Sequence, residues 1–167
     1  MEKQKTAQIP KRLEFVVAEP DKDTRCLYSF YLESLGVSED RVFLAQSGKE
    51  CLEIFKDKNK EEKKNREEEL LLPPTNDSIL VILDMHLKDI PSLHVAKEIT
   101  RINPQQKMIV TTTTSQLEDF KNKANDLGPI NAIKEDKILI KPFRFSQLLS
   151  LIRTMTINPN YGHFARQ

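Results

Sequence analysis

Five short apolar runs, none of them alternating with polar residues, constrain the fold of this chain more than any other feature. The most uniform is "LVIL" at 80–83, which ends at Asp84. Strands of this kind are typical of parallel sheets, where helices cover both faces. The runs are "LEFVVAE" (13–19), "RVFLAQ" (41–46), "SILVILD" (78–84), "KMIVTTTT" (107–114) and "KILIKPF" (137–143).

A segment with helical spacing follows each run. These segments are 22–35, 47–58, 92–103, 115–128 and 144–155. Gly36 and Gly128 are expected to end the first and fourth helices, whereas Ser47 and Ser115, each with a glutamate three residues later, are expected to cap the second and fourth. The alternation predicts an α/β fold, a doubly wound five-stranded parallel sheet flanked by five helices with right-handed crossovers.

The first helical segment contains enough apolar residues to define a face. We expect that face to consist of Cys26, Leu27, Phe30, Tyr31, Leu32 and Leu35. Cys26 and Cys51 have no metal-type spacing, so we interpret both as reduced, core-facing thiols of a cytoplasmic protein.

The length of the chain limits the number of domains, and its net charge limits the classes of partner. The 167 residues suffice for one domain, and a formal net charge of +1 gives no reason to expect nucleic acid or a membrane surface as partner. The N-terminal "MEKQKTAQIPKR" lacks the apolar region of a signal peptide, and no apolar run approaches the roughly 20 residues that cross a bilayer.

The domain boundaries follow from where periodicity begins and ends. We expect a flexible segment at 1–12, a domain at 13–155 and a tail without periodicity at 156–167. A charged insertion at about 56–78 interrupts the domain and ends in two prolines. Its charged part is compatible with a solvated extension of the second helix, through Glu–Lys pairs, or with a mobile loop.

Chemically active residues follow the strands. Glu19, Asp21 and Asp23 follow the first, Asp84 ends the third, threonines 111–114 end the fourth and Lys141 ends the fifth. Carboxyl ends of parallel strands share one edge, where ligands of such folds bind. A buried carboxylate needs a partner, and this set offers an ammonium for one acid and a divalent cation for the others. His86, His94 and His163 are too scattered for a metal cluster.

The pieces "FVVAEPDKDTR", "LVILDMHL", "KMIVTTTT" and "LIKPF", in this order and each ending the appropriate strand, resemble the receiver domain of two-component response regulators. The resemblance covers roughly residues 13–153. It implies a flavodoxin-like sheet with strand order 2-1-3-4-5.

The resemblance also implies a set of roles. Asp84 would be the phospho-acceptor, Lys141 would pair with it and then with the phosphoryl group, and Thr112 would be the switch hydroxyl, with Thr111 as the fallback. Mg²⁺ would be held by Glu19, Asp21, Asp84 and the backbone carbonyl of His86. The chain would not be an enzyme beyond magnesium-dependent self-phosphorylation and self-dephosphorylation.

The implied partners are proteins. A sensor histidine kinase or a phosphotransfer protein would supply the phosphoryl group, and a downstream protein would read the change. The resemblance also allows a homodimer through the fourth and fifth helices. About a dozen residues follow the fifth helix, too few for a DNA-binding helix-turn-helix module, so we expect a stand-alone receiver.

Several positions depart from the receiver pattern. Pro20 stands where a second acid usually contacts the metal, which is expected to weaken or rearrange magnesium binding, and Ile138 replaces a switch aromatic. Ser92 replaces a glycine, and the connection from Gly128 to Lys141 is about six residues longer than typical. A phosphorylation-independent adaptor with a degraded site is therefore the alternative. A nucleotide- or flavin-binding protein is disfavoured, because the acidic "EPDKD" repels phosphate.

Overall fold

A single parallel sheet forms the centre of the computed structural model, which describes residues 9–68, 79–126 and 137–156. Its strand order is β2-β1-β3-β4-β5. The strands are β1 (Glu14–Ala18), β2 (Val42–Ala45), β3 (Ile79–Asp84), β4 (Lys107–Thr113) and β5 (Ile138–Lys141). The predicted fold class and strand order are confirmed.

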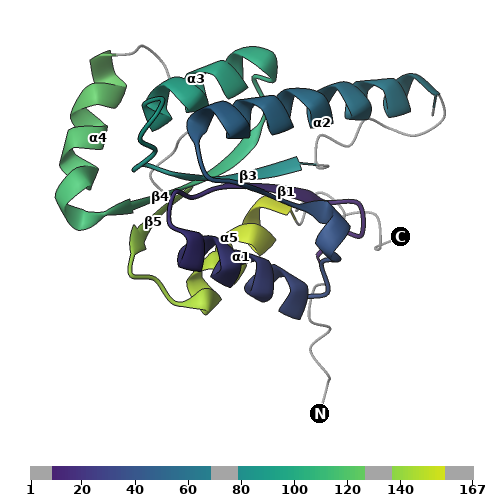
Figure 1. Ribbon diagram of the computed structural model, residues 1–167, viewed down its shortest axis with the longest axis horizontal. Coiled ribbons are helices and arrows are strands. Elements are labelled where there is room, and N and C mark those ends of the chain that lie inside the picture. Colours follow the sequence, from purple (N-terminus) through teal and green to yellow (C-terminus); the bar gives the residue numbers. More distant parts are fainter. Residues whose placement is uncertain (1–8, 69–78, 127–136, 157–167) are drawn as a thin grey trace, which may run out of the picture.

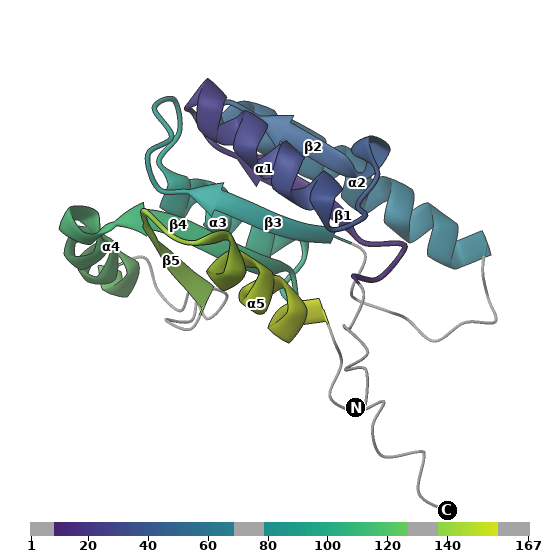
Figure 2. The same ribbon diagram turned by 90° about the horizontal axis from the view of Figure 1, so that it is seen from below.

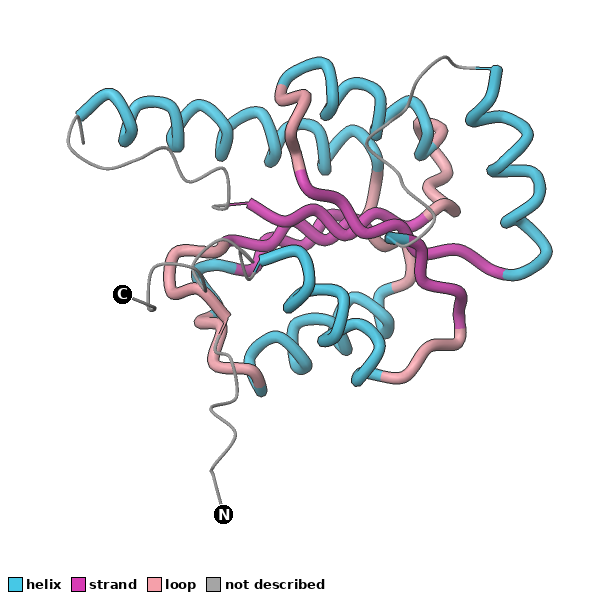
Figure 3. Tube along the Cα trace, turned by 180° about the vertical axis from the view of Figure 1, so that it is seen from behind, coloured by secondary structure: helices cyan, strands magenta, loops and turns pink. Residues whose placement is uncertain are grey.

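Helices cover both faces of the sheet (Figures 1 and 3). They are α1 (Lys22–Ser34), α2 (Gly48–Glu68), α3 (Ser92–Ile102), α4 (Thr114–Asp126) and α5 (Phe145–Thr156), with a short 3-10 helix, η1 (Glu39–Arg41). Helices α2 and α3 lie on one face, and α1 and α5 lie side by side on the other (Figure 2). Helix α4 begins where β4 ends, at the left of Figure 1.

The two-residue period of the strands divides the core into two clusters. In β3, the side chains of Leu80 and Ile82 pack with α1 and α5, whereas Val81 and Leu83 pack with α2 and α3. All six residues of β3 are buried. This double coverage is why the apolar runs do not alternate with polar residues.

The helix ends follow the predicted signals in part. Gly36 has a φ of 83°, the left-handed conformation expected after α1. At α2, the Glu50 backbone N–H donates to the Ser47 hydroxyl (3.2 Å), and the Glu50 carboxylate accepts from the Gln46 N–H (2.8 Å). Helix α4 begins at Thr114, so Ser115 lies in its first turn and is not its cap, and Gly128 lies outside the described residues.

The predicted apolar face of α1 is wrong in its details. Tyr28 and Leu32 are the buried residues of the helix, whereas Leu27 and Phe30 are 50% and 66% exposed. Cys26 is exposed, so its core-facing prediction is wrong, while Cys51 is buried as expected. Cys26 is exposed because it precedes the buried Tyr28 by two positions, which places it about 200° away, nearly on the opposite side of the helix.

The charged segment is helical as far as the structure describes it. Helix α2 continues to Glu68. Of the two alternatives for this part of the insertion, the extension of the second helix is therefore confirmed and the loop is not. The ammonium of Lys58 lies 3.5 Å from the Glu14 carboxylate, 2.9 Å from that of Glu61 and 4.2 Å from the centre of the Phe43 ring. These contacts hold the charged part of α2 against β1 and β2.

Other predictions lie partly outside the described residues. The rest of the insertion (69–78), most of the 128–141 connection and residues 1–8 lie there, as do residues 157–167 with His163. Helix α5 includes Thr156, one residue of the predicted tail. Among the described helices, none is both long and apolar enough to cross a bilayer.

Candidate functional site

Four polar side chains, each at the end of a strand or directly after it, share one face of the sheet at its carboxyl edge. Residues two positions apart along a strand lie on the same face of the sheet. A core residue on the α1–α5 side stands two positions before each of the four: Val17 before Glu19, Ile82 before Asp84, Ile109 before Thr111 and Leu139 before Lys141. Strand pairing brings them together, since Asp84 is opposite Thr111 and Thr113 is opposite Lys141.

Lys141 lies between two buried carboxylates. Its ammonium is 2.6 Å from Glu19 Oε2 and 2.6 Å from Asp84 Oδ2. Glu19 and Asp84 are 2% and 1% exposed. Burial acts to lower the pKa of Lys141, but the hydrogen bonds and charges of Asp84 and Glu19 outweigh burial and raise that pKa above its ordinary value. Lys141 is therefore a fixed positive charge, and the three groups together carry one net negative charge.

Thr111, and not Thr112, is the hydroxyl that meets Asp84. The Thr111 hydroxyl donates to Asp84 Oδ2 at 3.0 Å. Thr112 is also fully buried, but its hydroxyl lies 3.4 Å from the Thr113 carbonyl. Adjacent strand residues point to opposite faces, so Thr112 cannot face the same site as Thr111. The predicted placement of Thr112 beside Asp84 is wrong, and the fallback Thr111 occupies it.

The other oxygen of Asp84 belongs to the following turn. Asp84 Oδ1 accepts from the His86 backbone N–H at 2.7 Å and lies 3.1 Å from His86 Nδ1. The buried Ser92 hydroxyl donates to the Asp84 backbone carbonyl at 2.7 Å. Ser92, which departs from the receiver pattern in sequence, thus ties the start of α3 to the end of β3.

In the loop after β1, the carboxylates of Glu19 and Asp21 accept hydrogen bonds from the loop itself and from the first turn of α1. Glu19 Oε1 accepts from the Asp21 backbone N–H at 3.0 Å. Asp21 caps α1, because its Oδ1 accepts from the backbone N–H (2.8 Å) and the hydroxyl (2.7 Å) of Thr24, and these bonds lower the pKa of Asp21. Arg25 donates to the carbonyls of Glu19 and Pro20 at 2.7 and 2.8 Å. The loop is therefore fixed at both ends.

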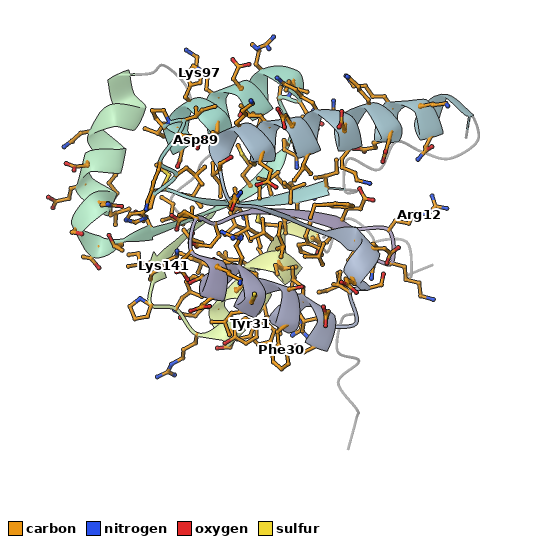
Figure 4. The ribbon with its side chains drawn as sticks, in the orientation of Figure 1. Arg12, Phe30, Tyr31, Asp89, Lys97 and Lys141 are labelled. Carbon is orange, nitrogen blue, oxygen red and sulfur yellow. The ribbon has the colours of Figure 1, made fainter. Side chains whose placement is uncertain are left out.

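Asp89 fixes the loop between β3 and α3, a role that the sequence did not predict. Its carboxylate accepts from the backbone N–H groups of Gly48 (2.8 Å) and Lys49 (2.9 Å) at the start of α2, and these bonds lower the pKa of Asp89 to about 2. A β-carbon at Gly48 would lie 2.9 Å from Val95 Cγ2, so any larger residue there would require Val95 to shift. Lys141 and Asp89 lie on the same side of the molecule, near the carboxyl ends of the strands (Figure 4).

The donor chemistry at this edge suits magnesium, but its present arrangement does not form a complete site. Glu19, Asp84 and the exposed Asp21 offer the carboxylate oxygens that Mg²⁺ prefers. In the part of the chain that the structure describes, no group of three or more His, Cys, Asp or Glu side chains is arranged to hold a metal ion. Glu19 and Asp84 are instead bonded to Lys141, and Pro20 supplies no side-chain oxygen.

Several solved structures that superpose on this chain are response regulator receiver domains. A response regulator receiver domain protein from Clostridium thermocellum superposes with a TM-score of 0.61 at 21% identity, over 85% of this chain and 92% of that one. The receiver domain of nitrogen regulatory protein C gives 0.61 at 18% identity, over 94% and 100%. This chain has the receiver fold. No family model matches the sequence, and no curated protein does.

Other receiver-fold structures agree. A CheY-like receiver domain protein from Methanospirillum hungatei JF-1 superposes with a TM-score of 0.58 at 19% identity, over 86% of this chain and 93% of that one. Within the receiver fold, the site edge of this chain holds Asp84 and Lys141, where the sequence placed them, together with the hydroxyl of Thr111 in place of the predicted Thr112. Ile138, three residues before Lys141, lies in β5 opposite Val110.

Proposed function

We propose that this chain is a response regulator receiver of the cytoplasm, with Asp84 as its phospho-acceptor. One observation carries the proposal. Asp84 Oδ2 receives both the Lys141 ammonium (2.6 Å) and the Thr111 hydroxyl (3.0 Å), at the carboxyl edge of a receiver fold. A carboxylate that meets a fixed cation and a hydroxyl donor has the partners that an incoming phosphoryl group requires.

The chemistry follows from these neighbours. An Asp84 oxygen attacks the phosphorus of a phosphorylated histidine or a small phosphodonor, and the donor's bond to phosphorus breaks. Lys141 offsets the negative charge that the phosphoryl group brings, and the Thr111 hydroxyl exchanges its carboxylate acceptor for a phosphoryl oxygen. Because Asp84 is 1% exposed, access requires that Lys141 or His86, its partly exposed partners, move aside.

Mg²⁺ belongs to the same proposal. Glu19, Asp84, Asp21 and the backbone carbonyl of His86 are the oxygens that would hold it, and the ion would neutralise charge between the carboxylate and the phosphoryl group. The net negative charge of the Glu19–Asp84–Lys141 group favours a cation. Pro20 and the role of Asp21 as a helix cap support weak binding, since Asp21 would have to leave Thr24.

The proposed partners are proteins. A sensor histidine kinase or phosphotransfer protein would supply the phosphoryl group, and a downstream protein, or a second copy of the chain, would bind differently once Asp84 is modified. No chemistry beyond gain and loss of the phosphoryl group is proposed.

Phosphorylation is tested by intact mass after incubation with acetyl phosphate and magnesium. We expect the wild type to gain one phosphoryl group and Asp84→Asn to gain none. Thr112→Val is the matched control, because this buried hydroxyl faces away from the site, and it should gain the group as the wild type does. No gain by the wild type at high magnesium, or an equal gain by Asp84→Asn, would overturn the proposal.

The second candidate is a phosphorylation-independent adaptor. It is favoured by the closed arrangement in which Lys141 already satisfies Glu19 and Asp84 while Asp21 caps α1. An adaptor would bind its partner equally well as the wild type and as Asp84→Asn, with or without acetyl phosphate. Binding that changes only when the wild type is treated would exclude it.

A further inference from the structure

The loop at 85–91, between β3 and α3, bonds to one oxygen of Asp84. The His86 backbone N–H in this loop donates to Asp84 Oδ1 at 2.7 Å. The other oxygen, Oδ2, meets the Lys141 ammonium and the Thr111 hydroxyl. A side chain that is bonded at both ends of its carboxylate is held in one orientation. The orientation of Asp84 therefore depends on where the loop places the His86 N–H.

Asp89 connects this loop to a distant part of the chain. Its two carboxylate oxygens accept from the backbone N–H groups of Gly48 (2.8 Å) and Lys49 (2.9 Å), which lie 41 and 40 residues away in sequence. Asp89 lies between the loop and the start of α2 (Figure 4). Both bonds are charge-assisted, and the dipole of α2 favours a carboxylate at this end of the helix. The contact therefore fixes the loop relative to α2.

Helix capping alone does not explain this arrangement. Ser47, at the start of α2, already accepts from the Glu50 N–H at 3.2 Å, so α2 has a cap from its own sequence. The helix that follows Asp89 in sequence is α3, yet the N-cap of α3, Pro91, makes no side-chain cap bond, and Asp89 bonds to α2 instead. The acid of this loop thus serves to connect the loop to α2.

We propose that Asp89 is a positioning residue of the Asp84 site. By tying the loop to α2, it holds the His86 N–H against Asp84 Oδ1. The carboxylate is thereby kept in the orientation in which its Oδ2 meets Lys141 and Thr111. Asp89 acts through His86 and touches no reacting atom. That this orientation serves phosphoryl transfer rests on the proposed function, whereas the positioning itself is a property of the folded chain.

Amide hydrogen exchange, followed by NMR without any phosphodonor, tests the positioning. Asp89→Asn removes the charge and replaces one acceptor oxygen by an NH₂ group, which cannot accept a hydrogen bond. We expect the His86 amide to exchange about 10-fold faster in this variant than in the wild type, the effect of one weakened hydrogen bond. The amide of Ile82, in the middle of β3, is the internal reference and should change only as far as the overall stability does.

Ser47→Ala is the matched control, because it removes a hydrogen bond at the same end of α2 that does not involve the loop. Both variants are expected to lower the stability of the chain, but only Asp89→Asn should change the exchange of the His86 amide. Gly48→Ala perturbs the contact from the opposite side, since its β-carbon would lie 3.1 Å from Ile90 Cβ in the loop. This variant should accelerate exchange at His86 as Asp89→Asn does.

Labelling then connects the positioning to the proposed reaction. Asp89→Asn should slow the reaction of Asp84 with acetyl phosphate about 10-fold, and Ser47→Ala should not. An unchanged His86 amide in Asp89→Asn, or equal changes of this amide in Asp89→Asn and Ser47→Ala, would overturn the inference. So would a wild-type labelling rate in Asp89→Asn. If the His86 amide responds as expected but the wild type gains no phosphoryl group, the positioning stands and only the proposed function fails.

Discussion

Replacing Lys141 by methionine removes the only charge that separates two buried carboxylates in the described site. Glu19 and Asp84 each lie 2.6 Å from its ammonium, and neither is more than 2% exposed. Methionine keeps most of the volume and the apolar stem. The variant therefore isolates the loss of charge from the loss of packing.

The expected magnitude follows from burial. Removing one member of a buried ion pair costs about 3–5 kcal/mol, because the remaining charge stays buried and unpaired. The Lys141 side chain is 24% exposed, so water solvates part of its charge and the lower end applies. We expect Lys141→Met to lose about 3 kcal/mol of unfolding free energy, or about 6–12 °C in melting temperature.

The loss should depend on pH with a definite sign. Without Lys141, the adjacent Glu19 and Asp84 carboxylates repel each other in the folded variant. A proton shared by the pair relieves this repulsion, so lowering the pH from about 8 to about 5 should reduce the deficit. In the wild type, folding raises the pKa of Lys141 from 10.5, so the stability contributed by its protonated form is lost only as the pH rises above 10.5 through the higher folded pKa.

Urea denaturation followed by circular dichroism measures both effects. Lys88→Met, at an exposed position of the loop after β3, is the matched control and should stay within about 0.5 kcal/mol of the wild type. A Lys141→Met deficit below about 1 kcal/mol, or a deficit that is the same at both pH values, would refute the ion-pair account of the site.

Three further outcomes follow from single contacts. Gly48→Ala should lower stability by about 1–3 kcal/mol in urea titrations, since its new β-carbon would lie 2.9 Å from Val95 Cγ2, and an unchanged midpoint would contradict the close approach. The wild type should be more stable than Asp89→Asn above pH 4 and lose this advantage as the pH falls towards 2, because folding lowers the pKa of Asp89 to about 2; a gap that stays constant in acid would contradict the capping role. Thr111→Val should slow labelling by acetyl phosphate about 10- to 100-fold while Thr112→Val leaves it unchanged, and equal rates would refute the assignment of Thr111 to the site.

The strands were predictable from sequence because burial on both faces leaves a uniform apolar run. The same reasoning located Glu19, Asp84 and Lys141, since strand ends of a parallel sheet meet at one edge. It failed at the fourth strand, where residues 111–114 are all threonine and give no pattern from which the facing side can be read. Counting in steps of two from the core residue Ile109 would have selected Thr111.

Helix α1 shows a second limit of sequence reasoning. Leu27 and Phe30 are as apolar as a core requires, yet Tyr28 and Leu32 are the buried pair. Hydrophobicity alone selected Leu32 correctly but also the exposed Leu27 and Phe30, and it missed Tyr28, which is buried in the core despite its polar hydroxyl. Asp89 was missed for another reason, because its partners in α2 lie 40 and 41 residues away in sequence and no local pattern connects them.

The position of the phosphoryl group tests the central claim most directly. An acyl phosphate formed with acetyl phosphate and magnesium can be reduced with borohydride, which marks the modified carboxyl group for peptide mass mapping. The account predicts the mark on Asp84 and on no other residue. A mark on Asp21, Asp89 or another acid, or an unmarked chain at high magnesium, would contradict it.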